Sequence, residues 1–344
     1  MNQLIEKDKF LEIYRIDPKD YEKTKLKWTE LEKIFSDYIS NLDKFNIIAD
    51  SINKYLLTCK NVHSVRSRVK DPEHLVEKII RKEINNQERN INIDNYLEEI
   101  TDLIGVRALH LFKSDWIEIH DHIAKKWDFV EDPIEYKREG DDCSYSEALK
   151  SKGIVEKVHD NGYRSLHYII KEKYLRNKEV KIELQVRTIF EEGWSEIDHR
   201  LRYPYYVGNA YLENSLLILN RLAGSADEMA EFIQALIEIM RKQEEKIIKL
   251  QEDCQKYKEK SERSNEPIYP TAAEAMSSIN TIQDNFILNS KELASRFMIS
   301  PYISDFLFKE KKCKSCGKTF QSSVIGSSLY EDYCEECRKR IFGL

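Results

Sequence analysis

Two short stretches of the chain alternate polar and apolar side chains in a way that suggests chemistry. Residues 161–167 read NGYRSLH and residues 182–188 read IELQVRT. Because alternate side chains of an extended strand face opposite sides, the polar members of each stretch share one face while the apolar members point into a core. The polar members are Tyr163, His167, Glu183, Gln185 and Arg187. These rows predict either a solvated sheet face or a nucleotide site.

A second acidic residue favours the nucleotide site. Asp102 stands just ahead of another strand pattern, in which Arg107 lies. Mg²⁺ takes one or two carboxylates together with phosphate oxygens, so Asp102 and Glu183 are the pair that a magnesium and phosphate site requires. Basic residues that can neutralise phosphates lie in the segment RSRVK, namely Arg66, Arg68 and Lys70. The set indicates phosphoryl transfer, in which catalysis is mainly positioning and charge neutralisation.

Helices and a sheet must position these residues. Residues 1–60 carry apolar side chains at helical spacing, and Asp71 ahead of Pro72 is a helix-start signal. Residues 104–188 change to short runs rich in β-forming residues. They are interrupted by a polar stretch at about 135–161, which is too long for an ordinary loop, so we expect a functional loop or one with its own helix. Helix then returns, including a long amphipathic helix that we interpret as a packing or coiled-coil element.

Bulk composition indicates a soluble, charge-rich globular protein. The 344 residues are 41% apolar and 34% charged. No apolar run approaches the roughly 18 residues of a membrane span, and the opening MNQLIEKDKF lacks the apolar core of a signal peptide. We therefore expect a cytoplasmic protein with no membrane partner. The net charge of −6 argues against non-specific coating of nucleic acid.

Four cysteines near the C-terminus form two pairs. They are Cys313, Cys316, Cys334 and Cys337, in the pattern C-x₂-C, seventeen residues, C-x₂-C. This spacing falls in the range of a four-thiolate zinc ribbon, whose Zn²⁺ is structural because no coordination position stays open. The segment SERSNEPIYP predicts a break ahead of the ribbon. We expect one domain at residues 1–265 and a second, with a helical linker and the ribbon, at residues 266–344.

Four motifs in order resemble the synthetase domain of the RelA/SpoT family, over about residues 62–203. They are RSRVKDPEHLVEKI, DLIGVRAL, NGYRSLH and IELQVRT. The resemblance implies an α+β fold with a nucleotidyltransferase-like mixed sheet flanked by helices, followed here by the long helix and the small ribbon. It also implies a pyrophosphokinase that transfers the β,γ-pyrophosphate of ATP to a 3′-hydroxyl. No room is expected for the hydrolase domain of the long members, because only residues 1–65 precede the first motif.

The resemblance also implies residue roles. Asp102 and Glu183 would hold Mg²⁺, with Glu183 also the candidate base for the acceptor hydroxyl. Residues for ATP would be Arg66, Arg68 and Lys70 on the phosphates and Arg107 on the adenine. Residues for the acceptor would be Tyr163, stacked on its base, with His167, Gln185 and Arg187 beside it.

The segment IFEEGWSEIDHRLRYP, residues 189–204, resembles the toxic branch of small alarmone synthetases, some of which act on the 3′ CCA end of tRNA. A helix packed under the site explains the spacing of its polar residues equally well. Further basic residues that could contact an RNA acceptor are Lys171, Lys173, Arg176, Lys178, Arg200 and Arg202. Two alternatives remain: an alarmone synthetase that uses GDP or GTP, and a non-catalytic RNA-binding protein.

A toxic synthetase fused to a zinc-finger-like domain resembles the CapRel type of single-chain toxin and antitoxin used against phages. The resemblance implies that the C-terminal domain holds the enzyme inactive until a phage protein binds, with the major capsid protein as a candidate trigger. Tyr330 and Tyr333, in YEDY beside the second cysteine pair, resemble the aromatic latch of the closed form. The alternative is that both tyrosines pack the small core of the ribbon.

Overall fold

The computed structural model divides the chain into two compact units, residues 1–227 and 228–344, each described by itself below. The described residues are 3–86, 88–141, 145–159, 161–175, 178–202, 210–264, 308–323, 333–334, 336–337 and 340. The predicted domain boundary between residues 265 and 266 falls just outside them and stays a prediction.

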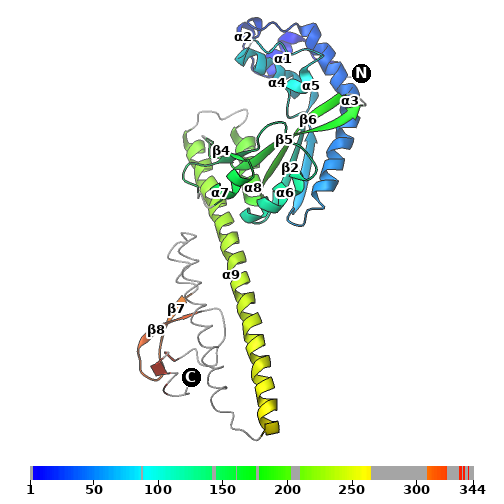
Figure 1. Ribbon diagram of the computed structural model, residues 1–344. Coiled ribbons are helices and arrows are strands. Elements are labelled where there is room, and N and C mark those ends of the chain that lie inside the picture. The colour runs from blue at the N-terminus through cyan, green and yellow to red at the C-terminus, as the bar shows by residue number, and fades with distance from the viewer. Residues whose placement is uncertain are drawn as a thin grey trace. The chain divides into compact units, whose positions relative to one another are not determined.

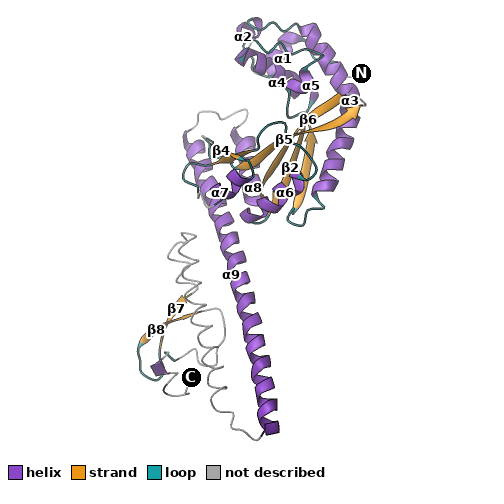
Figure 2. Ribbon diagram, viewed as in Figure 1, coloured by secondary structure: helices purple, strands orange, loops and turns teal. Residues whose placement is uncertain are grey.

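A six-stranded mixed sheet forms the centre of the first unit (Figure 2). Its strands, in spatial order, are β1 (Ser64–Val69), β2 (Ile104–His110), β6 (Lys178–Thr188), β5 (Ser165–Leu175), β3 (Ile134–Lys137) and β4 (Val155–Val158). The pairs β2 with β6 and β3 with β4 are parallel, and the other three neighbouring pairs are antiparallel. The predicted α+β class with a mixed sheet flanked by helices is confirmed.

Helices surround this sheet. Those in the described residues are α1 (Lys7–Ile13), α2 (Pro18–Glu22), α3 (Trp28–Leu56), α4 (Pro72–Asn85), α5 (Tyr96–Glu99), a 3₁₀ turn at Lys113–Asp115, α6 (Trp116–Ala124), α7 (Ser146–Ser151), α8 (Ile189–Arg202) and α9 (Ala210–Ser264). The Asp71 carboxylate accepts from the backbone N–H groups of Glu73 and His74, so α4 begins where the Asp-Pro signal predicts. The long polar stretch has secondary structure of its own, in β3, α7 and β4.

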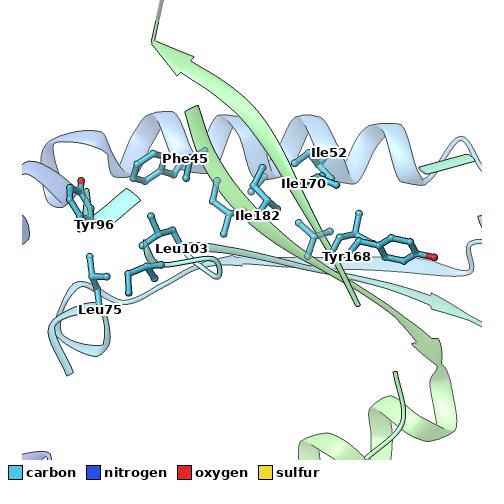
Figure 3. Packing of buried hydrophobic residues seen from close by; sticks show 14 of the residues in the cluster. Phe45, Ile52, Leu75, Tyr96, Leu103, Tyr168, Ile170 and Ile182 are labelled. Atoms are coloured by element: carbon cyan, nitrogen blue, oxygen red, sulfur yellow. The ribbon is translucent and has the colours of Figure 1, made fainter. Parts of the chain in front are cut away.

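One face of the sheet packs against α3 to form the core of this unit (Figure 1). Figure 3 shows Phe45 and Ile52 of α3 facing Ile170 and Ile182 of the sheet. All four side chains are at most 1% exposed. Burying a side chain of this size contributes about 1.5–3 kcal/mol. The alternation of apolar residues in β5 and β6 therefore fixes which face of the sheet turns to α3, and it leaves the opposite face to the polar row.

The described part of the second unit is small. It contains the C-terminal part of α9 and a two-stranded antiparallel sheet of β7 (Phe308–Lys312) and β8 (Thr319–Ser323). The four predicted metal ligands gather beside this hairpin. Among the described residues, none of the helices combines the length and the apolar character that a bilayer crossing needs.

Candidate active site

Strand register places the predicted residues on one face of the sheet. In the parallel pairing of β2 and β6, Gly105 lies opposite Glu183 and Arg107 opposite Gln185. In the antiparallel pairing of β1 and β2, Arg66 lies opposite Arg107. Because strands alternate their faces with period two, these residues share the side that α3 does not cover. Three strands that are distant in sequence thus contribute to one polar surface.

A cavity opens on this surface. It is lined by Arg66, Ser67, Arg68, Asp102, Gly105, Val106, Arg107, Glu183, Gln185 and Glu196. The two acids predicted as a pair, Asp102 and Glu183, both face this cavity, together with three of the arginines predicted for ATP. Lys70 belongs to the same cluster through its ion pair with Asp102. The structure therefore brings the predicted donor side together in one place.

Asp102 is held by two ammonium groups. Its Oδ2 lies 2.9 Å from Lys70 Nζ and 2.6 Å from Lys78 Nζ. Burial raises the pKa of Asp102, but the two lysines outweigh it and hold the pKa below its usual value. Lys78 was missed by sequence reasoning, although it lies within the first motif, RSRVKDPEHLVEKI.

The other oxygen of Asp102 fits a metal ligand. Oδ1 is buried and accepts no hydrogen bond from any residue that the structure describes. A buried carboxylate oxygen without a donor is costly unless a cation binds it. Glu183 faces the same cavity, so the two side chains fit the hard oxygen ligands that Mg²⁺ takes beside phosphates.

A chain of hydrogen bonds links Glu183 to the predicted acceptor residues. Glu183 Oε1 lies 3.2 Å from His167 Nδ1, and His167 Nε2 lies 3.0 Å from the Tyr163 hydroxyl. Arg187 Nη2 donates to the same hydroxyl at 2.6 Å and also donates to Gln185. Burial raises the pKa of Glu183, but the bond to His167 outweighs it, so the pKa lies below its usual value. Glu183 is therefore ionised at neutral pH.

The predicted acceptor residues thus form one network, although the environment of Arg187 differs from a solvated face. Its side chain is only 1% exposed. Its guanidinium carbon lies 5.0 Å from the centre of the Tyr163 ring, within the range of a cation–π contact. Burial raises the pKa of Tyr163, although Arg187 partly opposes this, so the phenol stays protonated at neutral pH. Tyr163 offers an aromatic ring that is backed by a fixed cation.

Glu192 of α8 pairs with arginines from both the predicted ATP-binding set and the predicted acceptor-binding set. Sequence reasoning did not give it this role. Its carboxylate lies 3.5 Å from Arg66, 3.0 Å from Arg107 and 3.3 Å from Arg187. The half-exposed Glu196, one turn further along, also pairs with Arg107. The sequence did contain a signal for this role. Because α8 follows β6 directly, its first turn must lie close to the polar face of the sheet. α8 packs on the site, as the interpretation of this segment as a packed helix expects, and its Glu196 also lines the cavity; the resemblance to the toxic branch stays a prediction.

One of the predicted RNA-contacting lysines lies among acidic partners. Lys171 lies 3.6 Å from Glu98 and 3.9 Å from Glu179, and Lys181, which was not predicted, lies 3.1 Å from the same Glu98. These pairs neutralise part of the proposed basic patch. Arg176 falls outside the described residues. Arg200, with His199, lines a shallow surface pocket that begins at Glu196 and so adjoins the main cavity.

The four cysteines in the second unit form a compact cluster. The Sγ atoms of Cys313, Cys316, Cys334 and Cys337 all lie within 4.8 Å of one another. Burial opposes ionisation of Cys313, but backbone N–H groups of Cys334, Cys316 and Ser315 outweigh it and lower the pKa of its thiol to about 6. Four thiols at this spacing fit a tetrahedral Zn²⁺ with Zn–S distances of about 2.3 Å. Tyr333 packs against the cluster, whereas Tyr330 lies outside the described residues.

Comparison with known proteins places this geometry in context. Residues 67–207 match a family model described as a region found in RelA / SpoT proteins. The chain is 30% identical over 183 residues to GTP pyrophosphokinase YwaC of Bacillus subtilis, covering 51% of this chain and 75% of that protein. It is 26% identical over 173 residues to GTP pyrophosphokinase YjbM of the same organism, covering 49% and 69%. A solved structure of small alarmone synthetase 1 from Bacillus subtilis with its product pppGpp aligns with 59% of this chain and 99% of that one, at 20% identity and a TM-score of 0.45.

Proposed function

The chain belongs to the RelA/SpoT family and is a pyrophosphokinase, and from this premise we propose that it transfers the β,γ-pyrophosphate of ATP to the 3′-hydroxyl of an acceptor nucleotide. One observation carries the proposal: Asp102 and Glu183 face a single cavity with Arg66, Arg68 and Arg107. In the transfer, the acceptor 3′-oxygen bonds to the β-phosphorus of ATP. The bond from that phosphorus to the α-phosphate oxygen breaks, and AMP leaves.

On the donor side, the residues position and neutralise the triphosphate. Mg²⁺, when bound, neutralises phosphate charge and polarises the phosphorus under attack. Asp102 and Glu183 are the residues that would hold it. Arg66 and Arg68 reach the cavity from β1 and supply bidentate donors for phosphate oxygens. Arg107 is paired with Glu192 and Glu196, so we expect the nucleotide to compete with these carboxylates for its guanidinium.

On the acceptor side, Glu183 is the proposed base. Its depressed pKa keeps it ionised at neutral pH, and it can therefore accept the hydrogen bond of the acceptor hydroxyl and take the proton as the new bond forms. His167 bridges Glu183 and Tyr163, so it orients the carboxylate while Tyr163 receives the acceptor base. Stacking of a base on an aromatic side chain contributes about 1–3 kcal/mol.

Two acceptors are candidates, and a specific observation supports each. The 3′ CCA end of tRNA is favoured by the resemblance of residues 189–204 to the toxic branch, and by the open surface at His199 and Arg200 beside the cavity. GDP or GTP is favoured by the names of the two relatives, both GTP pyrophosphokinases. We propose tRNA as the first candidate, because a polymer acceptor needs an approach that extends past the cavity.

We further propose that the C-terminal unit, with Zn²⁺ on its four cysteines, restrains the enzyme in cis until a phage protein binds. Its support is the resemblance to fused toxin and antitoxin chains. Tyr333 packs against the cysteine cluster. A purely structural role in the core of the ribbon is therefore the alternative to a role as a latch. Expression of Tyr330→Ala with Tyr333→Ala should arrest growth without phage, whereas Tyr333→Phe should not. Normal growth of the double variant at equal expression would count against the latch.

An acceptor assay tests the proposed reaction. The full chain and the Tyr330→Ala, Tyr333→Ala variant are incubated with Mg²⁺ and ATP labelled on either the α- or the γ-phosphate. The acceptor is deacylated tRNA, GDP or GTP. Pyrophosphate transfer predicts γ-label on the acceptor and α-label in AMP rather than ADP, with both signals lost in Glu183→Gln. Label on tRNA supports the first candidate and label on guanine nucleotide the second. If no AMP is released with any of the acceptors, the proposed pyrophosphate transfer is refuted.

A further inference from the structure

The loop that carries Tyr163 is bound on both sides by one residue of α9. Asn220 is 0% exposed. Its Nδ2 donates to the carbonyl oxygen of Gly162 at 2.8 Å, and its Oδ1 accepts from Arg164 Nη1 at 3.0 Å. Gly162 and Arg164 are the two neighbours of Tyr163 in the chain. A single amide therefore fixes the backbone before Tyr163 and the side chain after it.

Arg164 is held tightly in this arrangement. Its Nε and Nη2 donate to the two oxygens of Asp141 at 2.6 and 2.8 Å. Gly224, one turn after Asn220 on α9, leaves room for the guanidinium, since a Cβ there would lie 3.0 Å from Arg164 Nη2. That separation is tighter than nine in ten real Cβ contacts, so a side chain at position 224 would require the guanidinium of Arg164 to move by a few tenths of an ångström.

Gly162 is equally constrained. Its φ of +71° lies in the left-handed region that side chains rarely adopt, and a Cβ there would lie 3.1 Å from Arg138 Cγ. Its N–H donates to the carbonyl oxygen of His159 at 2.8 Å. The turn before Tyr163 is thus a specific conformation, and Asn220 is the side chain that bonds its carbonyl group.

We propose that Asn220 and Gly224 are positioning residues for the acceptor, acting through Tyr163. The inference rests on the proposed function, which gives Tyr163 the acceptor base. The far end of the Tyr163 ring is fixed by Arg187, while its backbone is fixed by α9. While both the bond to Arg187 and the bonds to α9 are present, the Tyr163 ring is held in a single orientation for stacking on a base. Because Asn220 and Gly224 both lie on α9, a shift of this helix along its axis displaces both contacts with the Tyr163 loop together and weakens the acceptor site.

The experiment compares four variants in the full chain with Tyr330→Ala and Tyr333→Ala as the common background. Asn220→Ala removes both bonds. Asn220→Asp keeps the side-chain oxygen that accepts a hydrogen bond from Arg164 and removes the N–H group that donates one to Gly162. Gly224→Ala adds the Cβ that meets Arg164. Ser225→Ala, at an exposed position of the same helix, is the matched control.

Two readouts are measured for each variant. Hydrogen exchange follows the Gly162 amide, with amides of β2 as internal reference. Steady-state kinetics give separate KM values for ATP and for the acceptor found in the label assay. We expect Asn220→Ala and Gly224→Ala to lose protection at Gly162 and to raise the acceptor KM about tenfold with the ATP KM unchanged. Asn220→Asp should fall between these variants and Ser225→Ala, which should match the parent.

The outcomes separate this inference from the proposed function. Unchanged exchange at Gly162 in Asn220→Ala overturns the inference. So does lost protection with an unchanged acceptor KM, or a parallel rise of both KM values together with a lower melting temperature. Should the parent protein transfer no pyrophosphate to any acceptor, the proposed function fails, and the exchange of Gly162 alone then decides whether α9 positions the Tyr163 loop.

Discussion

Two pairs of buried or partly buried carboxyl groups in the first unit behave in opposite ways. Asp102 and Glu183 lie beside lysines and a histidine, and the pKa of each is below its usual value. Burial raises the pKa of Glu135 to about 7 and that of Asp227 to about 8, and neighbouring acids add to both shifts. Neither oxygen of Asp227 accepts a hydrogen bond from the described residues.

The difference indicates which acids stay ionised and can bind a metal ion. Burial alone disfavours the ionised form of a carboxyl group. Asp102 remains ionised because the ammonium groups of Lys70 and Lys78 lie within 2.9 Å of its carboxylate. Glu135 lines a second cavity, on the other side of the sheet between β3 and α7, where Lys137 and Lys113 only partly oppose the effects of burial and of neighbouring acids on its pKa. The acids of the candidate site are therefore distinguished by the basic side chains that contact them, and burial alone does not distinguish them.

The strongest test of this comparison replaces one carboxyl group of each pair by an amide. Asp102→Asn should reduce pyrophosphate transfer on the order of 10³-fold, because it removes a proposed metal ligand and the partner of two lysines. Asp227→Asn should reduce transfer far less, since its carboxyl lies outside the cavity of the site and adjoins the site through Arg164. Initial rates of AMP release at neutral pH measure both. Equal losses in the two variants would erase the distinction between the groups.

A second test compares two carboxylates on α8. Glu192 is 5% exposed and contacts three arginines, so Glu192→Gln should lower the free energy of unfolding by about 3 kcal/mol because it leaves buried guanidinium charge unpaired. Glu196 has 46% side-chain exposure, and Glu196→Gln should cost less than about 1 kcal/mol. Urea unfolding at neutral pH measures both. Similar costs would show that Glu192 is not the partner on which the arginines depend.

A third test uses the pH dependence of Asp227. Because its folded pKa of about 8 lies above its ordinary value, the folded state binds more protons than the unfolded state, and stability falls as pH rises towards 8. The charged neighbours that face it are Glu191, Lys113 and Arg164. Asp227→Asn should therefore gain stability on the order of 5 kcal/mol at pH 8 relative to pH 4. Melting temperatures across this range measure the gain, and a constant offset would contradict it.

The sequence predicts much of the polar face but little of what restrains it. Period-two alternation in β6 predicts that Glu183 and Gln185 share a face, because strand geometry alone decides it. The Asp-Pro signal predicts the start of α4 for a similarly local reason. Lys78, Glu192 and Asn220 could not be assigned in this way. Each meets its partner only after a helix has packed on the sheet, and Asn220 lies 56 positions beyond Arg164 in the chain.

The finest test concerns Glu135, whose partial exposure makes the effect small. Glu135 lies opposite Leu166 in the pairing of β3 and β5, and Glu156 and Glu191 add to the rise of its pKa to about 7, while Lys137 and Lys113 oppose it. The stability cost of its raised pKa should build up as pH rises from its ordinary pKa to about 7 and vanish below the ordinary pKa. Glu135→Gln should therefore stabilise the protein on the order of 1 kcal/mol at pH 8 and not at pH 4. Urea midpoints at both pH values decide it, and an equal gain at both would mean that the ionisation of Glu135 is not the cause.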